Sequence, residues 1–279
     1  MKIAITGASG LIGRRLLTTL ASQGHSPYAL SRHAYKEEAL READAVVHLA
    51  GESVAQRWTA DAKRRILESR EAGTRSLVRT LAKLPRRPGV LVCASAVGYY
   101  GSRGDETLTE ASAPGTGFLP EVCVAWEREA QAAEELGIRV VRMRIGMALD
   151  RRGGALKSIL PVFRMGAGGK LGDGRQWMSW IHLDDLAALF RFALENPVVG
   201  PVNAVAPQPV TNADFTRELA RALRRPALFP APKLALRLLF GEMSEILLAS
   251  QRAVPQAAQA AGFGFRFPQL GPALADLLK

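Results

Sequence analysis

Three glycines near the amino terminus have the spacing of a phosphate-binding turn. The stretch Gly7-Ala8-Ser9-Gly10-Leu11-Ile12-Gly13 joins an apolar run at 2–6 to a helical period at 11–24. Glycines let the backbone turn tightly and approach a pyrophosphate, and the helix that follows offers unpaired N–H groups and a partial positive charge. A tight turn alone would also explain the glycines. Because the stretch lies at a strand–helix junction, it predicts a dinucleotide site. The predicted cofactor-binding residues are Gly7, Ser9, Gly10, Leu11, Ile12 and Gly13.

The end of the second expected strand, 26–31, indicates which dinucleotide is bound. An NAD site usually has an acidic residue here for the ribose 2′-hydroxyl, whereas an arginine accommodates a 2′-phosphate. This chain has Ser31 followed by Arg32. The pair favours NADP(H) over NAD(H), with a solvated surface arginine as the alternative. The third strand ends at Leu49, Ala50 and Gly51, where small residues would let the backbone pass close to adenine and ribose. The end of a buried strand explains Leu49 and Ala50 almost as well.

A hydride-transfer enzyme must also orient its substrate and move one proton. Ser95 ends the fourth expected strand, and Tyr99 and Tyr100 follow it. Ser95 could orient the nicotinamide or bind a substrate oxygen, with Ala96 as the alternative alignment. Either tyrosine could donate a proton, although a phenol of pKa about 10 needs a nearby cation at neutral pH. A packed loop explains the two tyrosines equally well.

Three other residues could take part in proton transfer. His182 is predicted as catalytic, with a structural role as the alternative, and Asp184 is expected to cap the helix that follows. Cys123 could be an acid or a nucleophile, but a cysteine on an amphipathic helix usually fills a core. Glu127 could be a base or an exposed helix residue. The histidines and cysteines lack metal-ligand spacing, so no metal is expected.

The order of the elements predicts a Rossmann-type, doubly wound α/β fold with a parallel sheet. Nearly continuous apolar strands alternate with helices, as in a sheet covered on both faces. Strands are expected at 2–6, 26–31, 44–50, 90–95 and 138–146, and helices at 11–24, 59–84 and 119–136.

The second half of the chain predicts a small, mostly helical substrate lobe. After Gly146 a short helix leads into a glycine-rich loop within 153–169, a helix covers 184–196, and prolines interrupt a helical tail from about residue 210. We expect an NADP-binding domain at 1–150, to which about 176–206 return. The C-terminal substrate lobe would comprise 151–175 and 207–279, over the carboxyl edge of the sheet.

Bulk composition excludes several protein classes. The 279 residues are 48% hydrophobic and 23% charged, and no apolar run is long enough to span a membrane. Two cysteines give no disulfide framework, and no signal peptide is recognisable, so a cytoplasmic protein without a membrane partner is expected. The net charge of +11 could suggest nucleic acid, but the basic residues look scattered and are not interleaved with aromatics. We therefore expect a small-molecule substrate and no nucleic-acid partner.

Several motifs together resemble one family of enzymes. They are GASGLIG at 7–13, HLAG at 48–51, GT at 73–74, ASAVGYYG at 94–101 and WIHLDDLA at 180–187. These are similar to the extended short-chain dehydrogenase/reductases. LAGESVAQRW at 49–58, FGEMSEILLASQRAVP at 240–255 and AGFGFRFP at 261–268 are similar to the "epimerase family protein" subgroup, which has a C-terminal domain of unknown function. The resemblance spans essentially the whole chain and implies an NADP-dependent oxidoreductase or epimerase.

The resemblance also implies further contacts. Ser95 and Leu119 would contact the cofactor, and the segments that carry Arg164, Arg175 and Trp177 would face the substrate. An arginine fork suits a phosphate or carboxylate, so an anionic substrate near Arg175 is predicted, with a solvated loop as the alternative.

Two departures from the family pattern concern the active site. Arg70 stands where extended members usually have an asparagine, and it could reach the pyrophosphate or pair with a neighbouring carboxylate. The usual Tyr-x-x-x-Lys is missing, and its positions fall on Val122 or Cys123 and on Trp126 or Glu127. The chain is therefore either an enzyme with a different proton donor or a catalytically silent NADPH-binding sensor.

The long helix at 59–84 bears on assembly. It has one apolar stripe, enough to pack on the sheet, and its other surface is charged. Extended relatives often dimerise through such helices, but here a monomer or weak homodimer is predicted.

Overall fold

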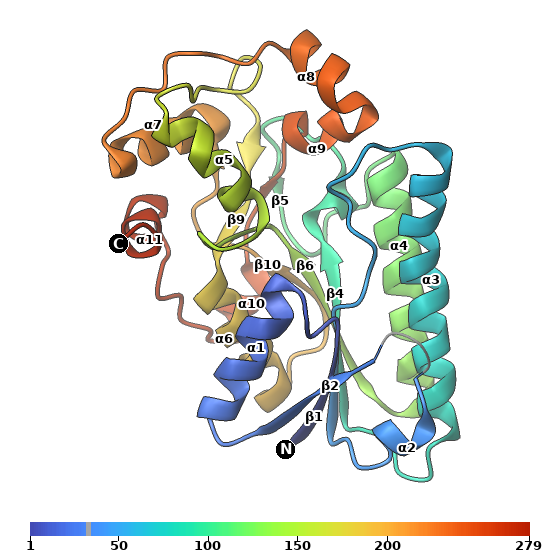
Figure 1. Cartoon of the computed structure of the whole chain (residues 1–279). Coiled ribbons are helices and arrows are strands. Elements are labelled where there is room, and N and C mark those ends of the chain that lie inside the picture. The colour runs from blue at the N-terminus through green and yellow to red at the C-terminus, as the bar shows by residue number, and fades with distance from the viewer. Residues whose placement is uncertain (32–34) are drawn as a thin grey trace.

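A six-stranded parallel sheet forms the centre of the protein (Figure 1). The computed structural model describes residues 1–31 and 35–279. The strand order is β2-β1-β3-β4-β6-β10, so the chain reverses direction across the sheet between β1 and β3. The strands are β1 (Lys2–Thr6), β2 (Ser26–Leu30), β3 (Ala45–His48), β4 (Val90–Ala96), β6 (Arg139–Ile145) and β10 (Gly200–Ala204). The predicted Rossmann-type fold is confirmed.

Helices cover both faces of the sheet, as the apolar strands require. Ile3 and Ile5 point to the face covered by α1 (Leu11–Ser22) and α6 (Leu183–Glu195). Ala4, between them, points to the other face, where α3 (Ala60–Lys83) and α4 (Phe118–Gln131) pack. This alternation follows from the two-residue period of a strand. Two short helices, α2 (Glu37–Leu40) and the 3-10 helix η2 (Ala132–Leu136), lie beside α3.

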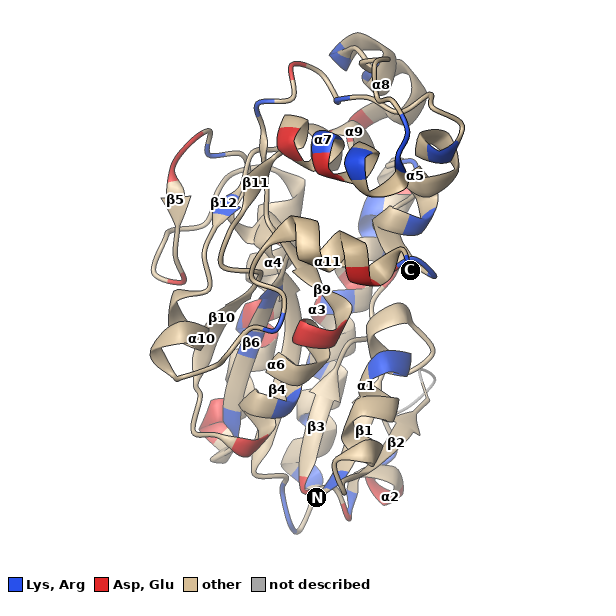
Figure 2. Ribbon diagram, turned by 90° about the vertical axis from the view of Figure 1, so that its left-hand side faces the viewer, with Lys and Arg blue, Asp and Glu red and all other residues tan. Residues whose placement is uncertain are grey.

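A smaller helical lobe stands over the carboxyl edge of the sheet (Figures 1 and 2). It contains α5 (Gly154–Arg164), α7 (Asn212–Leu223), α8 (Lys233–Phe240), α9 (Ser244–Leu248) and α11 (Leu270–Leu277). Its core includes Leu160, Phe163, Trp180, Phe215 and Leu274, which are buried together. A second hydrophobic core therefore holds the lobe together.

Three two-stranded ladders connect the lobe to the sheet domain. They pair β7 (Met147–Leu149) with β9 (Trp180–His182), β8 (Trp177–Met178) with β11 (Val210–Thr211), and β5 (Thr107–Leu108) with β12 (Arg252–Ala253). The tail then returns to the main core through α10 (Gln256–Ala260), where Ala258 is buried beside the sheet. Residues 256–265 thus pack on the sheet domain, while α11 packs on α7. No helix in the described ranges is long and apolar enough to cross a membrane.

Candidate functional site

The glycine turn after β1 has the geometry of an anion cradle. Gly7 has φ +67°, and its carbonyl accepts a hydrogen bond from the Gly10 amide at 3.0 Å. A Cβ added at Gly13 would lie 2.6 Å from the Cα of Ala8, so only glycine fits where α1 passes the turn. Helix α1 begins without a side-chain cap and has no acidic residue in its first turn. Its terminal N–H groups and partial positive charge are therefore available to an anion.

A buried chain of three side chains fixes this turn to its neighbours. The Thr6 hydroxyl oxygen accepts the amides of Leu49 and Ala50, both at 3.1 Å, so its proton goes to Nδ1 of His48 at 2.7 Å. His48 must then carry its proton on Nε2, which donates to the Thr74 hydroxyl at 3.0 Å. Burial, with the charge of Arg70 second, lowers the pKa of His48 to about 4. A neutral histidine thus ties β1, β3 and α3 together beside the phosphate turn.

Arg70 brings a cation to the same edge without a carboxylate partner. Its guanidinium donates to the carbonyl of Ile66 at 3.1 Å and lies 5.0 Å from the centre of the Trp126 ring. A Cβ added at Gly51 would be 3.1 Å from its Cζ, so the guanidinium lies directly against the backbone that ends β3. Burial lowers the pKa of Arg70. Among the described residues Arg70 forms no ion pair, and the carboxylate of Glu52 acts on it only through its charge, which favours the anion-binding prediction over pairing with a neighbouring carboxylate.

Ser95 takes part in a buried ion-pair network. Its hydroxyl donates to Oε1 of Glu127 at 2.7 Å, and the Arg144 guanidinium donates two hydrogen bonds to the same carboxylate, at 2.8 and 2.9 Å. The side chains of Glu127 and Arg144 are 5% and 4% exposed. Burial opposes the charge of Arg144, but the hydrogen bonds and charge of Glu127 outweigh it, so the pKa of Arg144 is raised. Glu127 is therefore a buried partner of Ser95 and Arg144. It is not an exposed helix residue, which was one of the two interpretations of the sequence.

The network also shows which residues of α4 face the site. Cys123 and Glu127 lie toward Ser95, four residues apart, as the missing tyrosine and lysine would. Val122 packs with Trp58, and Trp126 packs in the core under the sheet. Burial raises the pKa of the Cys123 thiol to about 12, which leaves it protonated and unreactive at neutral pH. Leu119, at the start of α4, packs against Gly98 and so borders the site.

The two tyrosines after β4 differ in their surroundings. Tyr100 is fully buried, donates to Oδ1 of Asn203 at 2.7 Å, and accepts from Arg144 at 3.0 Å. Burial raises its pKa to about 12. Tyr99 is half-buried, and the Arg144 guanidinium lies 3.5 Å from its ring centre. Of the two, only Tyr99 has both a cation beside its ring and a hydroxyl without a hydrogen bond to another described residue.

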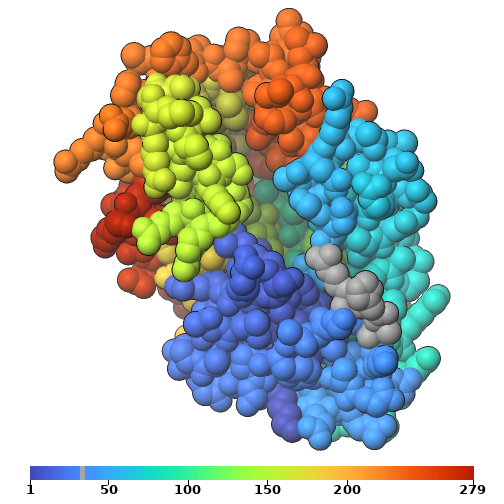
Figure 3. All heavy atoms as spheres, in the orientation of Figure 1, coloured from blue at the N-terminus to red at the C-terminus, as the bar shows by residue number. Residues whose placement is uncertain are grey.

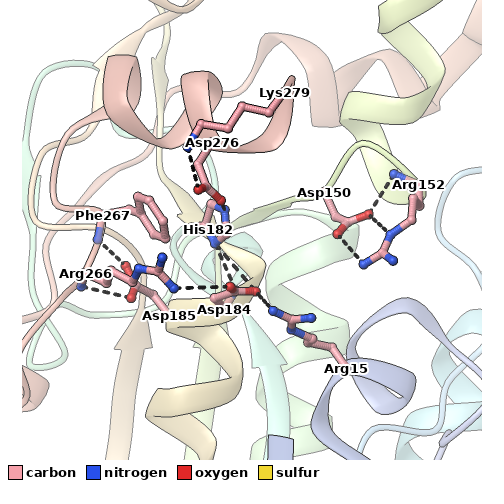
Figure 4. Close-up of polar contacts among 10 residues, drawn as sticks. All are labelled: Arg15, Asp150, Arg152, His182, Asp184, Asp185, Arg266, Phe267, Asp276 and Lys279. Atoms are coloured by element: carbon pink, nitrogen blue, oxygen red, sulfur yellow. Dashed lines mark hydrogen bonds and ion pairs between the residues drawn. The ribbon is translucent and has the colours of Figure 1, made fainter. Parts of the chain in front are cut away.

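His182 belongs to a separate polar cluster between α1, α6 and α11 (Figure 4). Its Nδ1 accepts the amide of Asp184 at 3.0 Å, so His182 is the cap of α6 and Asp184, expected in that role, lies in the first turn. The ring stacks on Phe267 at 4.0 Å, and Nε2 lies 3.5 Å from Oδ2 of Asp276. Asp184 also pairs with Arg15. These contacts support the structural alternative for His182.

The three predicted substrate residues lie on the lobe and its connections. Arg164 is at the exposed end of α5, and Arg175 is exposed on the loop before β8. Trp177 donates from Nε1 to Asp105 at 2.8 Å, and Arg252 lies 4.4 Å from the centre of its ring. Trp177 therefore joins β8 to the loop before β5, and the two arginines are free to meet an anion.

Figure 3 shows a hollow between the sheet domain and the lobe. Its walls are the blue phosphate-turn region, the light-blue segment after β3, α5 in lime and the orange α8–α9 region. Lys63 and Glu242 form an ion pair across it, from α3 to the segment after α8. Another depression, near Lys2, Tyr28 and Glu42, lies at the amino ends of β1 and β2, opposite the turn. We therefore assign the functional site to the hollow.

Sequence reasoning missed several residues that build the site. Thr6, Arg144 and Asn203 carry its buried polar network. Thr6 and Arg144 lie within strands that were predicted from their apolar residues, and Asn203 lies in β10, a strand that was not predicted. A charged residue inside an otherwise buried strand, as in RVVRMRI at 139–145, was the available signal for Arg144. Ser31 is described and exposed at the end of β2, whereas Arg32 lies outside the described residues.

The fold and the turn define a class: a Rossmann-type, dinucleotide-binding fold that carries a second, helical lobe. Family comparison is more specific, because residues 3–206 match the NAD dependent epimerase/dehydratase family. Residues 231–277 match a domain of unknown function, DUF1731. The chain therefore belongs to the NAD dependent epimerase/dehydratase family, and the predicted resemblance is confirmed.

Individual relatives cover the whole chain. The epimerase family protein YfhF of Bacillus subtilis is 39% identical, over 100% of this chain and 98% of the relative. A chloroplastic epimerase family protein of Arabidopsis thaliana is 38% identical, over 100% of this chain and 87% of the relative. Human epimerase family protein SDR39U1, crystallised with NADPH, is 32% identical with a TM-score of 0.92, over 100% of this chain and 99% of that one. The similarity thus includes both the sheet domain and the lobe.

Proposed function

We propose that this protein binds NADP(H) at the phosphate turn and acts as an oxidoreductase or epimerase on a small, anionic carbonyl, hydroxyl or sugar-nucleotide compound. The observation that carries the proposal is the uncapped start of α1 against the glycine turn. Its N–H groups would hold the pyrophosphate, and the unpaired Arg70 would add a positive charge beside Gly51. The human relative, whose crystal contains NADPH, supports the choice of nucleotide.

When bound, NADPH supplies the hydride, so the residues need only orient the substrate and provide a proton. The Ser95 hydroxyl proton is engaged by Glu127, which leaves its oxygen to accept a hydrogen bond. We assign proton donation to Tyr99. The Arg144 guanidinium lies over its ring, which places a cation beside the Tyr99 phenol. Arg164 and Arg175 would bind the anionic part of the substrate from the lobe.

Nucleotide binding is tested by titration calorimetry with NADPH and NADH. We expect NADPH to bind at least about tenfold more tightly, since an arginine at position 32 suits the 2′-phosphate. Arg32→Ala should remove this preference, whereas Arg70→Gln should weaken both nucleotides by about tenfold, the effect of one charge-assisted contact. Arg79→Gln, on the exposed outer face of α3, is the control. If neither nucleotide binds, the proposal is wrong.

A catalytically silent NADPH sensor is the second candidate. It is favoured by the positions of Cys123 and Glu127, because neither a protonated thiol nor an ion-paired carboxylate can do the work of tyrosine and lysine. Hydride transfer from NADPH to a panel of anionic aldehydes and ketones separates the two functions. Turnover that Tyr99→Phe abolishes supports the enzyme, while tight binding without turnover on any compound supports the sensor.

The proposal includes a monomer or weak homodimer in the cytoplasm. On the α3–α4 face Arg75 pairs with Glu71 and Glu129, and Arg128 pairs with both carboxylates. A tight dimer across this face would have to bury that charged network. Sedimentation equilibrium tests the prediction, and a stable dimer that Arg75→Glu disrupts would contradict it. Both cysteines are free and buried, which suits a reducing compartment.

A further inference from the structure

The lobe concentrates most of the net positive charge of the protein. Residues 151–175 and 207–240, here called the basic lobe, contain twelve Lys and Arg against three Asp and Glu. They therefore carry a net charge of +9 out of the chain's +11. The basic residues that seemed scattered along the sequence gather on α5, α7, α8 and their loops, as the blue ribbon in Figure 2 shows.

Many of these cations are unpaired. Arg217, Arg221 and Lys233 form ion pairs with Asp214, Glu218 and Asp173. In contrast, no ion pair within the described residues involves the exposed side chains of Lys157, Arg164, Lys170, Arg175, Arg224, Arg225 and Arg237. Their charge is available to an external anion.

The basic lobe also carries the most exposed large apolar side chains of the described residues. Of the large hydrophobic residues in the described chain, the six most exposed all lie in the basic lobe, at 66–77%. They are Met165, Leu228, Phe229, Leu234, Leu238 and Leu239. Only Leu236 of the eight residues of α8 is buried. Exposed apolar patches of this kind mark interaction surfaces.

The position of the patch favours a flat partner over a peptide. Helix α8 and the loop 224–232 form the end of the molecule opposite the amino ends of the sheet strands (Figures 1 and 3). The leucines therefore protrude from an end of the molecule. Helices that lie in the headgroup region of anionic bilayers typically combine leucine and phenylalanine with lysine and arginine.

We propose that the basic lobe docks on an anionic membrane surface, with Phe229, Leu234 and Leu238 entering the headgroup region and the arginines meeting lipid phosphates. The proposal replaces the expectation, made from the sequence, of no membrane partner. It is surface binding, which needs no membrane-spanning helix. Nucleic acid is a less suitable partner than a membrane, because a phosphate backbone makes no apolar contact with the six exposed apolar side chains. The inference does not depend on the proposed enzymatic activity.

Vesicle co-sedimentation of the full chain tests the proposal. We expect binding to phosphatidylcholine vesicles with about 30 mol% phosphatidylglycerol to be at least about tenfold tighter than to phosphatidylcholine alone, and to weaken with salt. Two double variants should each reduce the affinity for anionic vesicles about tenfold. They are Leu234→Gln/Leu238→Gln and Arg225→Gln/Arg237→Gln. Val199→Gln/Arg79→Gln, a pair of changes at exposed residues outside the basic lobe, should leave vesicle binding unchanged.

Three results would overturn the proposal: no sedimentation with anionic vesicles, equal binding by the leucine variant, or equally tight binding to duplex DNA or a soluble acidic polypeptide at the same salt. NADPH titration of the same variants keeps this question separate from the nucleotide site. Unchanged NADPH affinity with lost vesicle binding supports docking by the basic lobe. Loss of both means that the variants have disturbed the fold, and Leu239→Gln and Arg224→Gln singly then repeat the test.

Discussion

Glu127 occupies the position of the family's lysine, and its replacement by glutamine separates a structural role from a catalytic one. The Glu127 carboxylate accepts three hydrogen bonds, one from Ser95 and two from Arg144. Glu127→Gln would leave the buried guanidinium of Arg144 without its ion-pair partner. Removing one partner of a buried ion pair costs about 3–5 kcal/mol.

The magnitude should lie at the lower end of that range. The amide oxygen that the substitution introduces could still accept one hydrogen bond, and the hydroxyl of Tyr100 still contacts Arg144. We therefore expect a loss of about 3 kcal/mol in the free energy of unfolding, or a fall in Tm of about 6–12 °C for a chain of this size. NADPH affinity should change less than about threefold, since Glu127 lies outside the phosphate turn.

Urea unfolding, followed by tryptophan fluorescence, measures the loss in the free energy of unfolding. Asp61→Asn is the matched control, because its ion pair with Arg64 on α3 is exposed and its loss should cost less than about 0.5 kcal/mol. Glu127→Gln/Arg144→Gln completes a double-mutant cycle and should be less unstable than the sum of the single changes. A loss below about 1 kcal/mol for Glu127→Gln would refute the reasoning, since it would mean that water or a rearrangement already satisfies Arg144.

Three further predictions address the turn, the buried histidine and the proton donor. Gly13→Ala should abolish NADPH binding while the protein still folds, because the added Cβ would displace the turn beside Ala8. An NADPH affinity equal to that of wild type in titration calorimetry would count against the proposed anion cradle. The His48 pKa is lowered to about 4, so its contribution to stability is present above pH ~6.5 and is lost as pH falls toward 4, by up to about 3 kcal/mol. Stability measured from pH 7 to 4.5 should therefore fall more steeply for wild type than for His48→Gln, and parallel curves would show that His48 is not held neutral. Tyr99→Phe should lower kcat at least about a hundredfold with KM little changed, whereas Tyr100→Phe should mainly reduce stability, and the reverse pattern would exchange their roles.

The sequence by itself determined five of the six strands of the sheet, all but β10, and the phosphate turn. Strand and helix periods are local properties, and a glycine turn between β1 and α1 allows few other conformations. For this reason the expected helix at 59–84 and the observed α3 at Ala60–Lys83 nearly coincide. The choice of Ser31 and Arg32 for the 2′-phosphate remains a prediction from the sequence.

Only the tertiary structure decided how the polar side chains pair. Glu127 on α4 and Arg144 on β6 are 17 residues apart, and Tyr100 and Asn203 are 103 apart, so no local pattern could join them. The same holds for His182, which reads as a catalytic candidate in the motif WIHLDD but caps α6 and stacks on Phe267 from the distant tail. Charge is the clearest case: arginines that are dispersed along the chain gather on one lobe because helices α5, α7 and α8 fold together there. The same physical reason explains the buried polar pairs, the role of His182 and the charge of the lobe. Burial and charge density depend on which segments pack side by side, whereas spacing along the chain specifies only the segments themselves.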